Sequence, residues 1–428
     1  MIQPVSVPAG RPLISAVTGT NGKTSVGTAT LQLMRAAGWS AAGYDSTGIT
    51  DVDGVLHEAK VRRSPAYLPE LIDYQVRRGA QAISLEAFVG ILADGLFEHV
   101  EVDTAVCTGL ERDHLDVHGG VDGYWAAKLS LFERHLRPDG TAVLATDCVR
   151  GDMVREAARR RGARVVEVGE GGHVRLTDAH ETDGHLSGKL HLGEDPYPVT
   201  LPTVHSIAVT NLLLAATAVI AAGGSPEAVV AGLEQVAPPP GRLEIITQCD
   251  GITAMVDTAH NPGALRTALT AVRERTPGRV LVVFGAGGER DRGKRQEMGA
   301  IAAHLADLVV LNDDNPRREP PQRIRAEVRK GCPDCIEIPR RTDVILAALE
   351  MARPGDTVLV AGKGDETGQL VGTGRIPHDD REVIRQAMAA RRMRERDARR
   401  CGRRALSVHR QLRTNPNQGR TRSRGRTR

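Results

Sequence analysis

The chain has 428 residues, of which 40% are hydrophobic and 26% are charged. This globular composition excludes wholesale disorder and fibrous repeats, and the length suits two or three domains. Only 11 residues are aromatic, so the core must be built mainly from aliphatic side chains. The longest largely apolar stretch, Leu212 to Ala222, has 11 residues including one Thr and is too short to cross a bilayer. We therefore expect a cytoplasmic protein.

The charge is distributed unevenly. The net charge is +4, but residues 391–428 contain 15 Arg and no Lys against Glu395 and Asp397, which gives this segment a charge of +13. The remainder of the chain therefore carries −9. A segment so rich in arginine and so poor in apolar residues is expected to be disordered, dispensable for catalysis, and able to bind nucleic acid weakly.

Short aliphatic runs alternate with helix-period segments along most of the chain, which predicts βαβ units around largely parallel sheets. The first unit is a strand from Leu13 to Val17, a glycine-rich turn and a helix from Lys23 to Ala37. Residues 163–200, which include the run Ala163 to Val168, consist of short alternating stretches between Gly, Asp and Pro, and they predict a small antiparallel patch. Two further strands are expected, from Gln81 to Leu85 and from Thr104 to Thr108.

Three consecutive prolines mark a boundary near the middle of the chain. The segment Ala237-Pro-Pro-Pro-Gly241 stiffens the backbone and forbids helix continuation. We therefore expect a domain of residues 1–240, a domain of residues 241–390 and an arginine-rich tail, residues 391–428. Beyond the boundary the βα units resume, with strands Ala254 to Asp257, Arg279 to Phe284, Leu308 to Leu311 and Thr357 to Val360, and helices beginning near Asn261, Lys294, Pro321, Thr342 and Asp380.

A candidate phosphate-binding loop follows the first strand and opens the first helix. Its sequence is Gly19-Thr20-Asn21-Gly22-Lys23-Thr24. Glycines there let backbone N–H groups approach phosphate oxygens, and the helix N-terminus adds partial positive charge. Lys23 would reach the terminal phosphates of ATP, and Thr24 would hold Mg²⁺. The alternative is a glycine-rich turn around a solvated lysine, but the sequence and its context together favour the phosphate loop.

The segment Thr18 to Thr24 resembles the ATP loop of the Mur ligase superfamily, whose members are ATP-dependent amide-bond synthetases. Four further segments resemble the UDP-N-acetylmuramoyl-tripeptide synthetase type in the same order: Thr108 to Phe132, Pro240 to Leu265, Val283 to Met298 and Ala361 to Arg381. The resemblance spans residues 13–390. It implies an α/β fold with a P-loop NTPase-like central domain, built on a mostly parallel sheet, and a C-terminal Rossmann-like α/β domain.

Two departures from the muramyl ligases concern the carboxylate substrate. The chain begins almost at the ATP loop, so we expect it to lack the N-terminal domain with which those enzymes bind the UDP-sugar. The segment Ser84 to Leu96 is more similar to the Mur-ligase-like half of cyanophycin synthetase. The resemblance therefore predicts the reaction better than it predicts the substrate.

The resemblance implies a catalytic and metal-binding set of four residues beside the phosphate loop. Glu86 would complete a first Mg²⁺ site with Thr24, and His114 would bind a second ion. Lys128 matches a lysine that the family carbamylates, which converts an ammonium into an anionic oxygen ligand. Lys23, Glu86, His114 and Lys128 are thus the expected catalytic residues. Each has an ordinary alternative, such as a strand-end carboxylate, a structural histidine or a solvated cation.

The resemblance also assigns nucleotide contacts outside the loop. Asn211 matches the family's adenine-contacting asparagine, although its usual companion three residues earlier is Ala208 here. Arg242 matches a phosphate-contacting arginine. Asp257 and His260 would be brought to the nucleotide by the second domain, where a carboxylate can accept the protons of both ribose hydroxyls.

A third set of matches concerns the amine substrate. Asn315 and Arg317 lie in the segment Asp-Asn-Pro-Arg, which resembles the amine-recognition signature of the diaminopimelate-type enzymes. Arg290, Gly362 and Glu366 fall on matching positions. Fixed cationic and anionic groups of this kind suit the carboxylate and ammonium of an amino acid.

These observations predict an ATP-dependent carboxylate–amine ligase. ATP would phosphorylate a small-molecule carboxylate with the help of two Mg²⁺ ions, and an amino-acid-like amine would attack the acyl phosphate to give amide, ADP and phosphate. Two alternatives remain open at this stage. One is a polymerising ligase of the cyanophycin or folylpolyglutamate kind, and the other is a nucleic-acid-binding or regulatory P-loop NTPase, which the arginine tail suggests.

Overall fold

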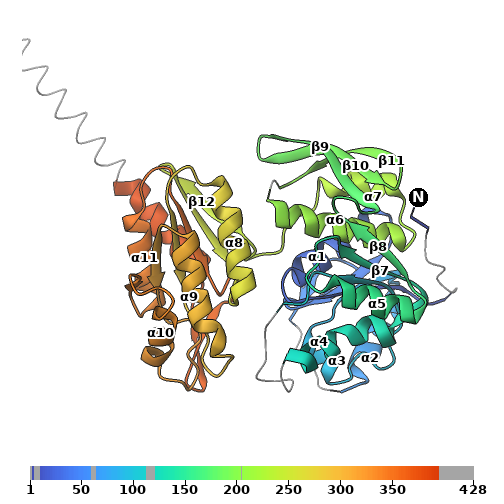
Figure 1. Ribbon diagram of the computed structural model, residues 1–428, viewed down its shortest axis with the longest axis horizontal. Coiled ribbons are helices and arrows are strands. Elements are labelled where there is room, and N and C mark those ends of the chain that lie inside the picture. Colours follow the sequence, from blue (N-terminus) through green and yellow to red (C-terminus); the bar gives the residue numbers. More distant parts are fainter. Residues whose placement is uncertain (1, 4–9, 59–63, 112–120, 204, 395–428) are drawn as a thin grey trace, which may run out of the picture.

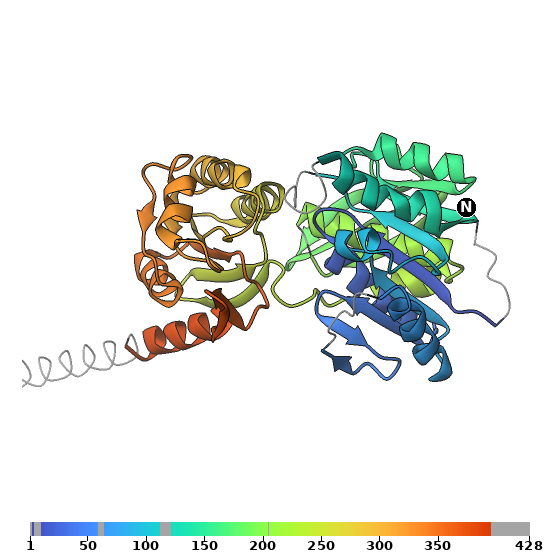
Figure 2. The ribbon, with the colours of Figure 1, turned by 90° about the horizontal axis from the view of Figure 1, so that it is seen from below.

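A computed structural model describes residues 2–3, 10–58, 64–111, 121–203 and 205–394. Figure 1 shows two α/β lobes, one coloured blue to green and the other yellow to red, joined by the segment that follows α7 (Pro226–Leu233). The proline-rich linker lies in this connection. Figure 2 shows from a second direction that the lobes face each other across it.

The first lobe is built on an 11-stranded sheet with the order β11-β10-β9-β8-β7-β6-β1-β5-β2-β3-β4. The central pairs β2–β5, β5–β1, β1–β6, β6–β7 and β7–β8 are parallel. These pairings place the carboxyl ends of β1 and β5 side by side, next to the phosphate loop. The strands are β1 (Leu13–Thr18), β2 (Ala41–Asp45), β3 (Gly48–Thr50), β4 (Leu56–His57), β5 (Ala82–Glu86), β6 (Val102–Cys107), β7 (Leu136–Ala145), β8 (Arg164–Val168), β9 (Val174–Thr182), β10 (His185–Leu192) and β11 (Asp195–Leu201).

Helices cover both faces of this sheet, and each face has its own apolar core. One core joins α1, α6 and α7, and the other joins α2, α3, α4 and α5. A parallel sheet needs both faces covered, because its connections cross over it as helices. The helices are α1 (Lys23–Ala36), α2 (Tyr67–Arg77), α3 (Val89–Ala93), α4 (Val121–Ser130), continued by a π-helical turn (Leu131–His135), α5 (Gly151–Arg161) and α6 (Ser206–Ala221).

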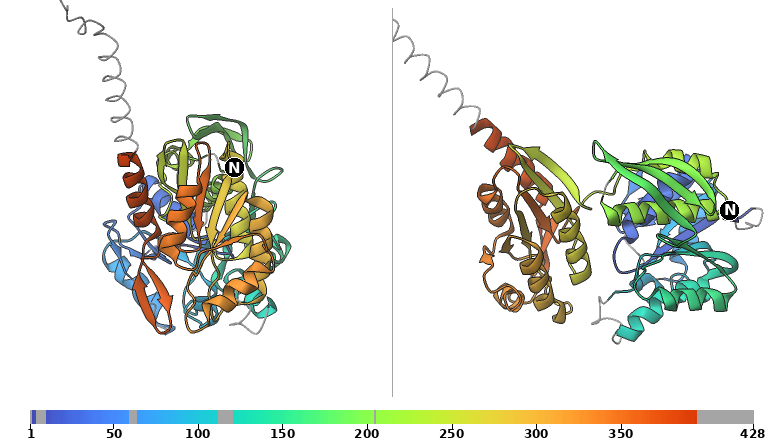
Figure 3. Two further views of the ribbon diagram at one scale, coloured as in Figure 1. Left: turned by 90° about the vertical axis from the view of Figure 1, so that its left-hand side faces the viewer. Right: turned by 45° about the horizontal axis from the view of Figure 1, so that its top comes forward.

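The prediction for residues 163–200 was wrong in one respect. The run Ala163 to Val168 does not belong to the antiparallel patch, because β8 pairs in parallel with β7. The reason is α5, which crosses from β7 to β8 and returns the chain in the same direction. Only β9, β10 and β11 form the antiparallel extension, which lies at the edge of the lobe in Figure 3.

The second lobe has a six-stranded sheet with the order β12-β13-β17-β14-β15-β16, parallel except for β12. Helices α8, α9 and α10 share one apolar core with it, and α11 and the final helix share the other. The predicted α/β class with mostly parallel sheets is confirmed. The elements are β12 (Glu244–Cys249), β13 (Ile252–Asp257), α8 (Pro262–Arg275), β14 (Val280–Phe284), α9 (Gly293–Leu305), β15 (Leu308–Leu311), α10 (Pro321–Arg329), β16 (Ile336–Glu337), α11 (Arg341–Met351), β17 (Thr357–Ala361), the hairpin β18 (Gly368–Val371) and β19 (Gly374–Pro377), and a helix over 380–394.

Candidate functional site

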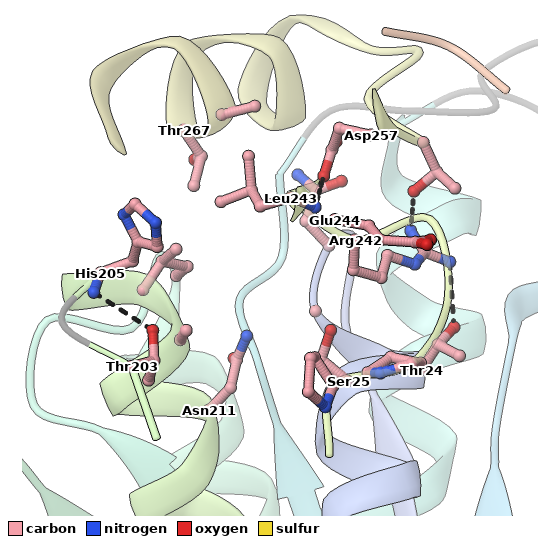
Figure 4. A pocket seen from close by; sticks show the side chains of 18 of the residues that line it. Thr24, Ser25, Thr203, His205, Asn211, Arg242, Leu243, Glu244, Asp257 and Thr267 are labelled. Carbon is pink, nitrogen blue, oxygen red and sulfur yellow. Dashed lines mark hydrogen bonds between the residues drawn. The ribbon is translucent and has the colours of Figure 1, made fainter. Parts of the chain in front are cut away.

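A cavity of about 1130 Å³ lies between the lobes and is lined by both. In Figure 4, Thr24 of α1 faces Arg242 of the second lobe, and Asn211 of α6 lies below Thr267 of α8. The residues predicted to bind ATP all line this cavity except Gly19. The structure therefore gathers, in one interlobe site, predicted residues that are up to 240 positions apart in the sequence, from Thr20 to His260.

The phosphate loop has the backbone conformation that its glycines predict. Gly19 and Gly22 have φ values of 143° and 82°, which favour glycine. A Cβ atom at Gly19 would lie 2.0 Å from Thr108 Oγ1, so no other residue fits there. Because Gly22 is the N-cap of α1, the backbone N–H groups of the first turn of this helix face the loop.

Glu86 meets the loop at the end of β5, as predicted. Thr24 Oγ1 donates a hydrogen bond to Glu86 Oε2 at 2.9 Å, and Lys23 Nζ lies 3.9 Å from Glu86 Oε1. The Ser46 backbone N–H also donates to Glu86 Oε2, at 3.2 Å. Glu86 is only 3% exposed, so these contacts compensate for burial of its carboxylate.

The pair Thr24 and Glu86 has the chemistry of a magnesium site that is completed by phosphate oxygens and water. Within the described ranges, no three His, Cys, Asp or Glu side chains gather into a group that could hold a metal ion. Magnesium commonly uses one or two protein carboxylates together with substrate phosphates, so a single carboxylate and a hydroxyl beside a phosphate loop fit this ion.

Lys128 lies in α4 and is brought to the loop. Its side chain is 1% exposed, its Nζ donates to the Gly19 carbonyl oxygen at 2.5 Å, and it lies 4.8 Å from the centre of the Tyr124 ring. A buried lysine is costly unless its ammonium is compensated, and these contacts do so. The fourth predicted member of this set, His114, falls outside the described residues.

The second lobe reaches into the site through Arg242. Its Nη2 donates to Thr24 Oγ1 at 3.2 Å (Figure 4), and its Nη1 donates to Thr258 Oγ1. Thr24 therefore contacts both the carboxylate of its own lobe and the guanidinium of the other. Thr258 has no predicted role, although it stands beside the predicted Asp257.

Asp257 ends β13, as predicted, and is held by backbone groups. Its two carboxylate oxygens accept hydrogen bonds from the Leu243 and Ala259 N–H groups, each at 2.8 Å. Burial raises the pKa of this carboxyl, and Arg242 and the two N–H groups act in the opposite direction. His260 is exposed on the cavity side, where its Nδ1 lies 2.7 Å from the Thr258 carbonyl oxygen.

Two residues of the site that sequence reasoning missed are Asn261 and Glu111. Asn261 Nδ2 donates to Asn21 Oδ1 at 3.0 Å, and Asn21 Nδ2 donates to Glu111 Oε2 at 3.0 Å. A Cβ atom at Gly263 would lie 1.6 Å from Glu111, so the start of α8 approaches this carboxylate closely. Both residues lie in segments that carry the family resemblance, and this was the available signal.

Asn211 stands where α6 passes the phosphate loop. Its Oδ1 would lie 3.0 Å from a Cβ atom at Gly22, and its side chain lines the cavity. Thr203 and His205 continue the same wall, and neither was predicted (Figure 4). Burial lowers the pKa of His205, so its imidazole is neutral near pH 7.

Asn315 and Glu366 of the predicted amine set are in contact. Asn315 Nδ2 donates to Glu366 Oε2 at 3.1 Å. Lys363, which sequence reasoning missed, is fully buried and donates to Asn315 Oδ1 at 2.7 Å and to Glu366 Oε2 at 3.1 Å. The Leu370 N–H also donates to Asn315 Oδ1, at 2.9 Å, so the orientation of this amide is fixed.

The other amine-set residues lie at the same edge of the second sheet. Arg317 donates to the Gly288 carbonyl oxygen at 2.7 Å, and its pKa is lowered by burial and by the nearby Arg290. Gly362 donates its N–H to the Asp257 carbonyl oxygen at 2.9 Å, which links the amine set to the nucleotide set. None of the five predicted amine-set residues lines the interlobe cavity.

Comparison with known proteins agrees with this geometry. The Mur ligase middle domain matches residues 17–219, and the Mur ligase glutamate ligase domain matches residues 241–364. The UDP-N-acetylmuramoyl-L-alanyl-D-glutamate–2,6-diaminopimelate ligase of Rhizobium meliloti (strain 1021) is 38% identical over 375 residues, which cover 87% of this chain and 77% of the relative. The chain belongs to the Mur ligase family. The ligase of the same name from Bradyrhizobium diazoefficiens is 39% identical, and the alignment covers 90% of this Mur ligase and 80% of that relative.

Solved structures support the same assignment. A structure of a UDP-N-acetylmuramoyl-L-alanyl-D-glutamate–2,6-diaminopimelate ligase aligns with a TM-score of 0.60 and 29% identity, over 89% of this chain and 79% of that chain. The folylpolyglutamate synthase of Mycobacterium tuberculosis aligns with a TM-score of 0.65 at 21% identity, over 82% and 88% of the two chains, and shows the shared fold.

Family membership confirms the predicted ligase. This Mur ligase is an ATP-dependent amide ligase that acts on a small-molecule carboxylate and an amine, and its family requires magnesium. In the part of the chain that the structure describes, no helix has the length and apolar character that a membrane span needs.

Proposed function

We propose that this Mur ligase joins a carboxylate to an amino-acid-like amine through an acyl phosphate and releases ADP and phosphate. The observation that carries the proposal is the contact of Thr24 with both Glu86 and Arg242 at the N-terminus of α1. It brings a hydroxyl, a carboxylate and a guanidinium from both lobes to the place where the γ-phosphoryl group of ATP would lie. Phosphoryl transfer needs such positioning and charge compensation.

Each nucleotide-binding residue has a proposed task. The free N–H groups at the start of α1 bind phosphate oxygens, and Lys23 and Arg242 offset the charge that develops as the γ-phosphoryl group moves. Asn211 contacts the adenine, and Asp257 accepts hydrogen bonds from the ribose hydroxyls. His260 joins them from the second lobe.

Two metal positions are proposed. Thr24 and Glu86 hold the first Mg²⁺, and His114 with a carbamylated Lys128 holds the second. Magnesium bound there would neutralise phosphate charge. A carbamyl group on Lys128 would lie at the phosphate loop, because Lys128 Nζ contacts the Gly19 carbonyl oxygen at 2.5 Å. Lys128→Ala should lose activity and regain part of it with added short-chain carboxylate.

The amine site is proposed at the carboxyl edge of the second sheet. Arg290 and Arg317 would bind the carboxylate of an amino acid, while Glu366 and the carbonyl oxygen of Gly362 would accept its ammonium. Asn315 would orient the ligand through its amide. Amine binding requires the second domain, proposed as residues 241–390, to close on the first, proposed as residues 1–240, which also excludes water from the acyl phosphate.

The test is a coupled assay for ADP and phosphate with Mg²⁺, carboxylate and amine, with hydroxylamine as a trap for the acyl phosphate. Omitting the carboxylate should stop ADP release, and hydroxylamine should yield a hydroxamate. Lys23→Ala should abolish both signals while the thermal unfolding curve is retained. AMP as product, or full turnover by the Lys23 variant, would contradict the proposal.

The arginine-rich tail, which the sequence places at 391–428, is proposed to bind nucleic acid weakly and to be dispensable for catalysis. The final helix continues to Arg394, and Arg391 donates to the Leu349 carbonyl oxygen at 2.9 Å, so truncation should begin after residue 394. Residues 395–428 lie outside the described part. A variant that ends at Arg394 should keep its ligase rate and lose nucleic-acid binding that weakens steeply as salt rises. Loss of the rate in a folded variant would contradict this.

A further inference from the structure

The end of the interlobe cavity beside Glu86 has an unusual lining. Tyr44, Asp45, Ser46 and Phe88 line this end together with Lys23, Thr24 and Glu86. Because an acyl phosphate forms next to the metal-binding carboxylate, the group attached to the reacting carboxylate must pass close to these side chains.

Three aromatic side chains gather at this end. The ring centres of Tyr44 and Phe88 are 6.2 Å apart at an interplanar angle of 40°, and those of Tyr44 and Tyr67 are 6.3 Å apart at 71°. The whole chain has only 11 aromatic residues among 428. Aromatic rings favour offset or edge contacts with a further ring at such distances.

Phe88 and Tyr44 both line the cavity, and Phe88 is the more exposed of the two. Tyr44 is 2% exposed and belongs to the apolar core of its lobe, against which Tyr67 and Phe88 are partly buried. Phe88 is the N-cap of α3, and its carbonyl oxygen accepts a hydrogen bond from the Ile91 N–H at 3.1 Å. The Phe88 ring therefore packs against Tyr44, and its backbone is held by a hydrogen bond two residues after Glu86.

The charges at this end disfavour an anionic substituent. Asp45 and Glu86 are both acidic. The cations among the described residues near them are Lys23, which lies 3.9 Å from Glu86, and Arg242, which donates to Thr24 at 3.2 Å, and both are expected to bind phosphate. A substrate arm with additional carboxylates would meet like charge there, whereas an uncharged ring would bury apolar surface against Phe88.

We propose that Phe88, supported by Tyr44, is a specificity-determining residue for the carboxylate substrate. It selects an acid whose carboxyl group is joined, directly or through a short linker, to an uncharged aromatic ring. This inference rests on the proposed function, since it assigns the acyl substrate class of the same site.

The test compares three carboxylates, each in two assays. The probes are 3-phenylpropanoate, 3-cyclohexylpropanoate and N-acetylglutamate. Binding is measured by calorimetry with the non-hydrolysable ATP analogue AMPPNP and Mg²⁺ present, and activation is measured as ATP-dependent hydroxamate formation. The phenyl acid should bind at least threefold more tightly than the cyclohexyl acid, and N-acetylglutamate should bind least tightly.

Variants connect the preference to the ring. Phe88→Ala should weaken binding of the phenyl acid about tenfold, and Phe88→Leu, which retains apolar volume, should remove the preference for phenyl over cyclohexyl. The KM for ATP should change less than twofold. Tyr74→Ala is the matched control, because Tyr74 is 50% exposed on α2 and does not line the cavity.

The two proposals fail in different ways. If N-acetylglutamate binds best, or if the phenyl preference survives in Phe88→Leu, the aromatic subsite is wrong, while hydroxamate formation from any acid still supports the ligase mechanism. If the phenyl acid binds in a manner that depends on Phe88 but no acid yields ADP or hydroxamate, the subsite stands and the proposed reaction is wrong.

Discussion

The amide of Asn261 links the second lobe to Asn21 of the first. Its Oδ1 caps α8 by accepting a hydrogen bond from the Ala264 N–H at 2.9 Å, and its Nδ2 donates to Asn21 Oδ1 in the phosphate loop at 3.0 Å. The position of the loop is thereby coupled to the first turn of a helix in the other lobe. One side chain thus serves both the stability of α8 and the geometry of the nucleotide site.

Substitution at Asn261 should separate these two roles. Asn261→Ser keeps a good N-cap and loses the bridge to Asn21, so stability should change little while the KM for ATP rises several-fold. Asn261→Ala loses both, and its free energy of unfolding should fall by about 1 kcal/mol in addition. Urea denaturation and steady-state kinetics measure the two effects. Equal kinetics for Asn261→Ser and the unmodified protein would show that the bridge has no functional role.

Glu86→Gln should weaken magnesium dependence specifically. The amide retains the size of the carboxylate and can still accept from Thr24, but it loses the negative charge that a divalent ion requires. The Mg²⁺ concentration for half-maximal rate should rise at least about tenfold. Glu98→Gln, at an exposed position of the same lobe, is the control and should show no change. An unchanged magnesium titration for Glu86→Gln would place the ion elsewhere.

Lys363→Met should impair the amine site without changing the ATP site. The ammonium of Lys363 donates to both Asn315 and Glu366, and its loss removes a charged partner from each of them. The KM for the amine should rise about tenfold or more, and the KM for ATP should stay within twofold. Lys330→Met, at an exposed position, is the matched control. A parallel rise in both KM values would indicate a general structural defect.

The acid sensitivity of the second lobe should depend on Glu319. Arg295, which is fully buried, donates to both carboxylate oxygens of Glu319 at 2.8 and 2.7 Å, and this contact lowers the pKa of Glu319 from 4.5 to about 2. Because the folded-state pKa is the lower one, the stabilisation is complete above pH 4.5 and is lost as the pH falls toward 2.

Glu319→Gln should therefore lower the free energy of unfolding by about 2 kcal/mol at pH 7, and the difference from the unmodified protein should shrink below pH 4.5. Thermal unfolding between pH 3 and pH 7 measures this dependence. Glu350→Gln removes a carboxylate whose ion pair with Arg394 is largely exposed, and it should change stability little at any pH. A pH-independent effect of Glu319→Gln would mean that packing, not charge, is responsible.

Local signals explain what sequence reasoning predicted correctly. The phosphate loop is a run of six adjacent residues between a strand and a helix, and the first turn of α8 is set by Asn261 and Pro262. Such features depend on backbone dihedral angles and hydrogen bonds within a few residues, and the sequence alone specifies them. Alternation of aliphatic and helical segments likewise predicted the α/β class.

The sequence by itself determined the phosphate loop, the strand and helix pattern and, through several family segments, the ligase reaction. Tertiary structure alone decided that β8 joins the parallel sheet, that Asn261 bonds Asn21 and that Lys363 bonds Asn315. These contacts join residues distant in the sequence, so they depend on strand order and register. A side chain's local sequence carries no information about the neighbour that folding brings to it, which is why Lys363 and Phe88 appeared only in the structure.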